Sequence, residues 1–284
     1  MALQLKQIHK ASFVSYIFLG LSGALSTLAF SPFDIKLVLP FTLAILIFFT
    51  VNSKNFIDAC KHAFAWGLGY WISGTGWLIV SIYYYGNTNI IISSLIILLM
   101  GILLSVAFIA PFAAVRLIQF THNILLKSFF LASILIILEL SRFLLLGGFP
   151  WLLPGLVLLD TYGQIMIPIF GVYGASYIIY FFASLIALSI IENKKNFLFL
   201  GILCLSILLP NQTNLNQSLD ESLSLSIIQP SLDPFKKYME GSQLNIEDTL
   251  INLTNNSSDV DLIIWPESPL PLSLIHISEP TRPY

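Results

Sequence analysis

The chain has 284 residues, of which 56% are hydrophobic and only 10% charged, and its formal net charge at pH 7 is −2. Because soluble domains carry about 25% charged residues, this composition excludes an ordinary soluble protein and indicates an integral membrane protein. The sequence shows no basic patch suited to nucleic acid, so we expect no nucleic-acid partner.

Seven apolar segments resemble membrane-spanning helices, which need about 20 mostly apolar residues each. They cover residues 12–30, 35–51, 60–82, 89–115, 125–146, 165–191 and 196–209. Lysine and arginine gather in the loops that a cytoplasmic N-terminus would place inside the cell, and this bias predicts that orientation. We therefore predict a polytopic α-helical membrane bundle of about seven spans over residues 1–210, with the chain after it outside the cytoplasm.

The third segment is rich in glycine, and its cysteine neighbour has no metal-ligand partner nearby. Small residues allow helices to approach closely, so the glycines predict packing rather than a cofactor site. They are Gly67, Gly69, Gly74 and Gly76.

Cys60 and Cys204 are far apart, without His or Cys at ligand spacing. We expect no metal site and no cofactor.

Two ionisable residues, Glu139 and Arg142, lie near the end of the fifth segment. Their i,i+3 spacing allows them to pair on one helix face. Ionisable groups at membrane depth are functional candidates by default, so a structural pair and a functional pair are both open.

A loop rich in glycine and proline follows, at residues 148–155. Glycine and proline stop the helix, and Phe149 and Trp151 suit the membrane interface. One interpretation is a re-entrant loop that binds a lipid through Phe149, Pro150 and Trp151. The other is an aromatic-belt loop without a substrate, and the residues alone favour neither.

The C-terminal part changes character after a polar linker at residues 211–222. Residues 223–229 alternate like a strand, residues 244–253 have helical spacing, and an apolar run at 262–265 ends at Pro266. This strand–helix–strand order is the beginning of an α/β layer.

Glu267 follows the second of these strands directly. Sheets often present catalytic groups at the ends of strands, and a carboxylate there can act as a general base or acid. The alternative is an exposed turn glutamate without a role, which spacing alone favours.

Several motifs, in this order, resemble the bacterial apolipoprotein N-acyltransferase family. They are Phe30-Ser-Pro-Phe33, Gly76-Trp77, Gly148-Phe-Pro-Trp-Leu152, Phe170-Gly-Val-Tyr-Gly174, Ile228-Gln-Pro230 and Ile264-Trp-Pro-Glu-Ser268. The resemblance implies a membrane bundle in the bacterial inner membrane that carries a periplasmic nitrilase-like (carbon–nitrogen hydrolase) domain. Such enzymes transfer an acyl chain from a phospholipid to the N-terminal amino group of diacylglyceryl-cysteine apolipoproteins by covalent catalysis.

The resemblance assigns one member of the catalytic triad of that family. Glu267 matches the general base, which works with a cysteine nucleophile and a lysine that stabilises the oxyanion. The lysine and the cysteine have no match, because no cysteine follows Cys204 and Lys236 and Lys237 precede the glutamate. We therefore expect this chain to be inactive.

The resemblance is lost after Pro271. Residues 223–271 are then expected to be the N-terminal part of a C-terminally truncated nitrilase-like domain. Residues 272–284 resemble translated sequencing-adapter DNA and are expected to be non-native. Two alternatives remain: a membrane-tethered nitrilase-type amidase, and a non-enzymatic transporter or scaffold, which the scarcity of ionisable residues in the spans disfavours.

Overall fold

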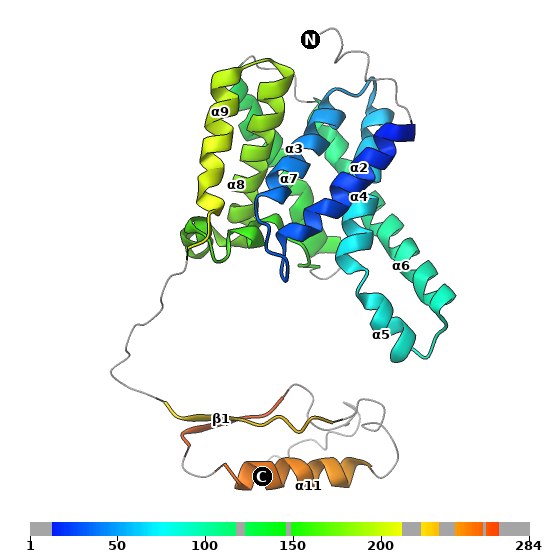
Figure 1. The fold of residues 1–284 in the computed structure, drawn as a ribbon, viewed down its shortest axis with the longest axis vertical. Coiled ribbons are helices and arrows are strands. Elements are labelled where there is room, and N and C mark those ends of the chain that lie inside the picture. The colour runs from blue at the N-terminus through cyan, green and yellow to red at the C-terminus, as the bar shows by residue number, and fades with distance from the viewer. Residues whose placement is uncertain are drawn as a thin grey trace, which may run out of the picture. The chain divides into compact units, whose positions relative to one another are not determined.

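The structure is a computed structural model, and it describes residues 13–117, 123–145, 149–211, 223–232, 242–257 and 260–266. The chain divides into two compact units. Residues 1–213 form the helical unit, and residues 214–284 form the α/β unit (Figure 1).

The helical unit consists of α-helices joined by 3₁₀ segments and one π-helical turn, η2. In chain order the elements are α2 (Phe13–Ser26), η1 (Thr27–Ala29), α3 (Val38–Val51), α4 (Phe56–Thr75), α5 (Leu78–Tyr84), α6 (Ile90–Leu104), η2 (Ser105–Ile109), η3 (Ala110–Leu117), α7 (Ile124–Leu145), η4 (Pro154–Leu158), η5 (Tyr162–Ile165), α8 (Met166–Ile191), α9 (Lys195–Cys204) and η6 (Leu205–Leu208). The α8 helix packs against α3, α7 and α9, and α4 packs against α2, α3 and α6.

Three helical stretches in the described ranges are long and apolar enough to cross a membrane: Ile90–Leu117, Ile124–Phe143 and Tyr162–Ile191. Other apolar helices are shorter, such as Val38–Val51 with 14 residues. At about 1.5 Å per residue, such a helix covers about 21 Å of a hydrocarbon core about 30 Å thick. The structure thus supports a membrane-type helical region. Helices occupy all seven predicted segments, but seven full spans are not shown.

Two of the long helices are interrupted at residues that cannot continue a regular α-helix. After α6, the chain forms a wide π-helical turn and then the 3₁₀ segment η3, which contains Pro111. Proline has no N–H to donate and crowds the carbonyl four residues earlier, so the turn before it opens. In α8 the break is at Gly171, whose φ of 69° and ψ of 175° suit a residue without a side chain.

Helices α2 and α4 approach each other closely at glycines. A Cβ atom on Gly69 would lie only 1.8 Å from the carbonyl oxygen of Gly20, and one on Gly23 only 1.9 Å from that of Trp66. The two backbones are therefore in direct contact, as small-residue interfaces allow. This confirms the packing role predicted for Gly69.

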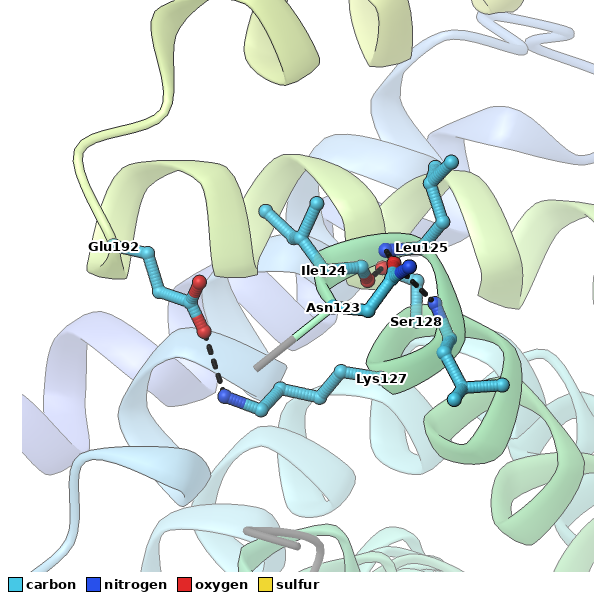
Figure 2. Close-up of polar contacts among 7 residues, drawn as sticks. Asn123, Ile124, Leu125, Lys127, Ser128 and Glu192 are labelled. Atoms are coloured by element: carbon cyan, nitrogen blue, oxygen red, sulfur yellow. Dashed lines mark hydrogen bonds and ion pairs between the residues drawn. The ribbon is translucent and has the colours of Figure 1, made fainter. Parts of the chain in front are cut away.

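At the beginning of α7, polar contacts cap this helix and tie it to the end of α8 (Figure 2). The Asn123 side-chain oxygen accepts hydrogen bonds from the backbone N–H groups of Leu125 and Leu126, at 3.0 and 3.2 Å. These groups have no partner within the helix. Lys127 Nζ lies 2.6 Å from Glu192 Oε1, and this ion pair joins the two helix ends.

The α/β unit has the predicted strand–helix–strand order. Strands β1 (Leu225–Ile227) and β2 (Leu262–Ile264) pair in parallel, with Ser226 opposite Ile263, and helix α11 (Ser242–Asn255) lies between them in sequence. The small core of this unit consists of Ile228, Ile246 and Leu250, with Leu253 and Ile263 packed against it. The opposite sheet face exposes Leu225, Ile227, Leu262 and Ile264, although parallel sheets are usually covered on both faces.

We expect Gly69→Ala to destabilise the helical unit, because the added Cβ must push α2 and α4 apart. Overpacking of this kind typically costs about 1–3 kcal/mol. This outweighs the gain of about 1 kcal/mol in helix propensity from Gly to Ala. Thermal unfolding of the purified protein in detergent would measure it. The matched control is Gly20→Ala on the same interface, whose Cβ would lie at an ordinary 3.5 Å from Ala65 O. Equal stability of the two variants would contradict the backbone-contact interpretation.

Candidate functional site

The segment from Phe149 to Gly155 is held by a buried arginine from the preceding helix. Arg142 is 4% exposed, and its Nη2 donates to the carbonyl oxygen of Phe149 at 3.1 Å and to that of Trp151. The guanidinium lies over the ring of Trp71, with Cζ 5.2 Å from the centroid. The arginine therefore binds the backbone of the loop while its planar group packs on an aromatic ring.

The far end of this segment is attached to α8 through a carboxylate. The Gly155 N–H donates to Ser176 Oγ at 2.9 Å, and this hydroxyl donates to Glu139 Oε1 at 2.8 Å. The hydroxyl of Tyr180 donates to Glu139 Oε2. Glu139 is only 1% exposed, so these hydrogen bonds replace those that its carboxyl group would otherwise make to water.

Glu139 and Arg142 do not form the ion pair that their spacing allowed. The nitrogen atoms of Arg142 lie beyond salt-bridge distance from the carboxyl oxygens of Glu139. Arg142 binds Phe149 O, and Glu139 accepts from Ser176. Arg142 binds one end of the segment directly, and Glu139 is linked to the other end through Ser176. The structure thus answers the question left open by the i,i+3 spacing: the two residues hold the loop.

Helix α4 supplies the third attachment, at the middle of the segment. The hydroxyl of Tyr70 donates to the carbonyl oxygen of Leu152 at 2.6 Å. The side chain of Leu152 lies against Gly74, where a Cβ would be 2.2 Å from Leu152 Cδ1. Gly74 therefore makes room for the loop.

Next to this segment the helical unit contains a cavity of about 730 Å³. It is lined by three stretches that are distant in sequence: residues 27–36, 73–77 and 150–160. The indoles of Trp77 and Trp151 meet in its wall, with ring centroids 5.3 Å apart. A volume of this size lies within the usual range for small-molecule pockets, about 300–1,000 Å³.

The cavity wall is mostly apolar, with a charged group at one side. Lys36 Nζ lies 2.5 Å from Asp34 Oδ1, and the lysine side chain is largely buried while the aspartate is half exposed. Asp160 also lines the cavity. An apolar chain and a polar headgroup could therefore both find complementary surface here.

Of the predicted lipid-binding residues, Pro150 and Trp151 line the cavity and Phe149 does not. Phe149 packs inward against Trp71, with ring centroids 5.7 Å apart. Sequence reasoning did not select Phe30, Phe33, Asp34, Lys36, Trp77 and Asp160 as site residues, although two of the quoted motifs contain Phe30, Phe33 and Trp77. Their shared location depends on how the helices cross.

Glu267, Lys236 and Lys237 lie outside the described residues. The structure does describe the strand before Glu267. Trp265 Nε1 donates to Thr254 Oγ1 of α11 at 3.0 Å. At the other end of β2, Asp261 Oδ2 accepts from Ser224 N at 2.8 Å and from Ser224 Oγ at 2.7 Å. These hydrogen bonds lower the pKa of Asp261 below its usual value.

No group of three or more His, Cys, Asp or Glu residues that could hold a metal ion occurs within the described ranges. Cys60 and Cys204 are both free. What the helical unit offers is therefore an apolar cavity with a firmly held wall.

Comparison with known proteins gives a consistent result. The family model of the apolipoprotein N-acyltransferase N-terminal domain matches residues 22–185. The apolipoprotein N-acyltransferase of Wigglesworthia glossinidia brevipalpis is 28% identical over 255 residues, 88% of this chain and 50% of the relative. Those of Vibrio vulnificus (29% identity, 88% and 49%) and Haemophilus influenzae (28% identity, 95% and 52%) are similar. The chain spans about half the length of these curated relatives.

We expect the β1–β2 pairing to weaken in acid. Because the pKa of Asp261 is lowered in the folded state, its contribution is present above the unfolded pKa of about 4 and is lost as the pH falls through the lowered folded pKa. The protection of the Leu262 and Ile228 amides against hydrogen exchange, corrected for intrinsic rates, would report it. In Asp261→Asn the protection should be lower at neutral pH and nearly independent of pH. An unchanged acid response in this variant would assign the effect to another group.

Proposed function

Because this chain belongs to the apolipoprotein N-acyltransferase family, we propose that it serves the transfer of an acyl chain from a phospholipid to the N-terminal amino group of diacylglyceryl-modified apolipoproteins. The match to the family model over residues 22–185 carries this proposal. The relatives named above are all apolipoprotein N-acyltransferases. Its partners would then be the phospholipid donor, the apolipoprotein acceptor and the surrounding membrane lipids.

The proposed topology is a multi-pass protein of the bacterial inner membrane with seven spans and a cytoplasmic N-terminus. Cationic residues support it. Arg116 donates to the carbonyl oxygens of Val51 and Lys54 at the C-terminal end of α3. Lys36, which lines the cavity, lies just before the N-terminal end of the same helix. Under the positive-inside rule, the end with Arg116 and Lys54 faces the cytoplasm and the cavity faces the periplasm.

We propose that the cavity binds the lipid. Its apolar wall suits an acyl chain, and the indoles of Trp77 and Trp151 suit the boundary between acyl chains and headgroups. Lys36 and Asp34 offer polar partners on the same wall. Phe149 supports this wall from behind, through its contact with Trp151.

Glu267 is proposed as the general base in the nitrilase-like part of the protein. Its position after β2, and the match of residues 264–268 to the family motif, support this role. The cysteine nucleophile of the family has no counterpart after Cys204. We therefore propose that the 284-residue chain does not turn over by itself.

The role of Glu267 can be tested in a chimera in which residues 1–271 of this chain are followed by the remaining C-terminal part of the Haemophilus influenzae relative. If the chimera N-acylates a diacylglyceryl-cysteine peptide, Glu267→Gln should lower kcat by about 10²–10⁴-fold, the usual contribution of a general base. Mass spectrometry of the peptide measures the product. The 284-residue chain, assayed in parallel, should give none. Product from that chain would overturn the proposed inactivity, and an active Glu267→Gln chimera would overturn the assignment of the base.

Lipid binding in the cavity can be tested with a phospholipid that carries a photoreactive diazirine on its acyl chain. In nanodiscs, adducts on cavity peptides should be competed by excess unlabelled phospholipid, because the cavity holds few molecules. Adducts on the exposed face of α6 should not respond in this way, since bulk lipid contacts that face. Leu156→Trp, which fills the cavity, should reduce the cavity adducts. Leu95→Trp on α6 is the matched control. Cavity adducts that behave like those on α6 would contradict a binding site.

A further inference from the structure

We propose that Arg142 is a positioning residue that sets the cavity wall by holding Trp151 against Trp77. This inference rests on the proposed lipid-binding function for its biological meaning. Its structural content, the placement of one indole by an arginine, can be tested separately. Arg142 itself does not line the cavity of about 730 Å³, so it acts through the backbone of the loop.

The guanidinium of Arg142 binds two backbone carbonyl groups of the loop. Nη2 donates to the carbonyl oxygens of Phe149 and Trp151, which lie on either side of Pro150. Proline fixes its own φ and has no N–H. Holding the carbonyls before and after it therefore leaves the intervening backbone little freedom. The side chain of Trp151 emerges from this restrained stretch.

Aromatic rings hold the side chain of Arg142 in place. Its guanidinium carbon lies 5.2 Å from the ring centroid of Trp71 and 5.9 Å from that of Phe108. The counter-charge of Glu139 is nearby in sequence but is engaged by Tyr180 and Ser176. The guanidinium is therefore packed between aromatic rings and directed at the loop. Its Nε, buried without a partner, indicates that the two carbonyls determine its orientation.

Two other attachments would still hold the segment in a protein without Arg142. The other side-chain hydrogen bonds to the described segment are Tyr70 to Leu152 O and Gly155 N to Ser176. Both lie on the C-terminal side of Trp151. Loss of the arginine thus frees the side that carries Trp151, while Leu152 and Gly155 stay attached. The 5.3 Å contact between the Trp151 and Trp77 rings is the contact that should loosen.

The test measures that contact by fluorescence. In a Cys60→Ala/Cys204→Ala background, Trp151→Cys keeps the backbone carbonyl and accepts a bimane label, which a nearby tryptophan quenches. The quenching that disappears in Trp77→Phe is the part due to Trp77. We expect this part to be lost in Arg142→Gln. It should be reduced in Arg142→Lys, because a lysine lacks the planar fork and cannot reproduce the same packing and donation.

Arg116 provides a matched control. It also donates to two backbone carbonyls, those of Val51 and Lys54, but at the other end of α3. Arg116→Gln and Arg116→Lys should leave the Trp77-dependent quenching unchanged. The unfolding temperatures of the Arg142→Lys and Arg116→Lys proteins should be similar. If Arg142→Gln fails to give monodisperse protein, Arg142→Lys, which keeps the charge beside Glu139, decides the question.

The outcomes separate the two proposals. Trp77-dependent quenching that is equal in the Arg142→Lys and Arg116→Lys proteins would overturn the positioning role, whatever the lipid experiment shows. Cavity adducts that are not competed in the protein with native Arg142 would overturn the proposed lipid site, whatever the bimane shows. If both proposals hold, Arg142→Lys should also reduce the competed cavity adducts, and Arg116→Lys should not.

Discussion

Three backbone carbonyl groups, those of Phe149, Trp151 and Leu152, accept hydrogen bonds from side chains buried within a helix bundle. A backbone carbonyl that is buried without a donor costs several kcal/mol. A loop can enter the bundle only if the surrounding helices supply donors. Arg142 from α7 and Tyr70 from α4 do so. The cavity, its tryptophan pair and its polar side all depend on this condition.

The same condition explains why two opposite charges, three residues apart on one helix, do not neutralise each other directly. Pairing Glu139 with Arg142 would leave the carbonyl groups of Phe149 and Trp151 without their donor. Directing the carboxylate to Ser176 and Tyr180, and the guanidinium to the loop carbonyls, satisfies the charges and the backbone together. Buried ionisable groups in a membrane-type bundle often mark a transport pathway. Here their contacts are those of structural supports for the cavity wall.

Local sequence features predicted much of this architecture. Runs of apolar residues located the helices, and alternation and proline located β1 and β2. The glycines of the third segment indicated close packing, which Gly69 and Gly20 confirm. Pro150 and Trp151, two of the three residues expected to bind lipid, line the cavity. Phe149 was selected with them because all three lie in one short motif, but neighbouring side chains in a turn can point to different sides. The sequence offered Trp77 only as part of the Gly76-Trp77 motif, because an aromatic residue at a helix end does not reveal which loop it will face.

The sequence by itself determined that this is a membrane-type chain with a strand–helix–strand segment behind it, because hydropathy and periodicity are local properties. The family motifs are short stretches of sequence, so they were also recognisable without the structure. The tertiary structure alone shows that residues 27–36, 73–77 and 150–160 share one cavity. It also shows that Arg142 binds the loop, whereas Glu139 binds Ser176 and Tyr180. Partner choice in a water-poor interior depends on which donors and acceptors other helices bring within about 3 Å. Helix crossing sets those distances, and no spacing along the chain encodes them alone.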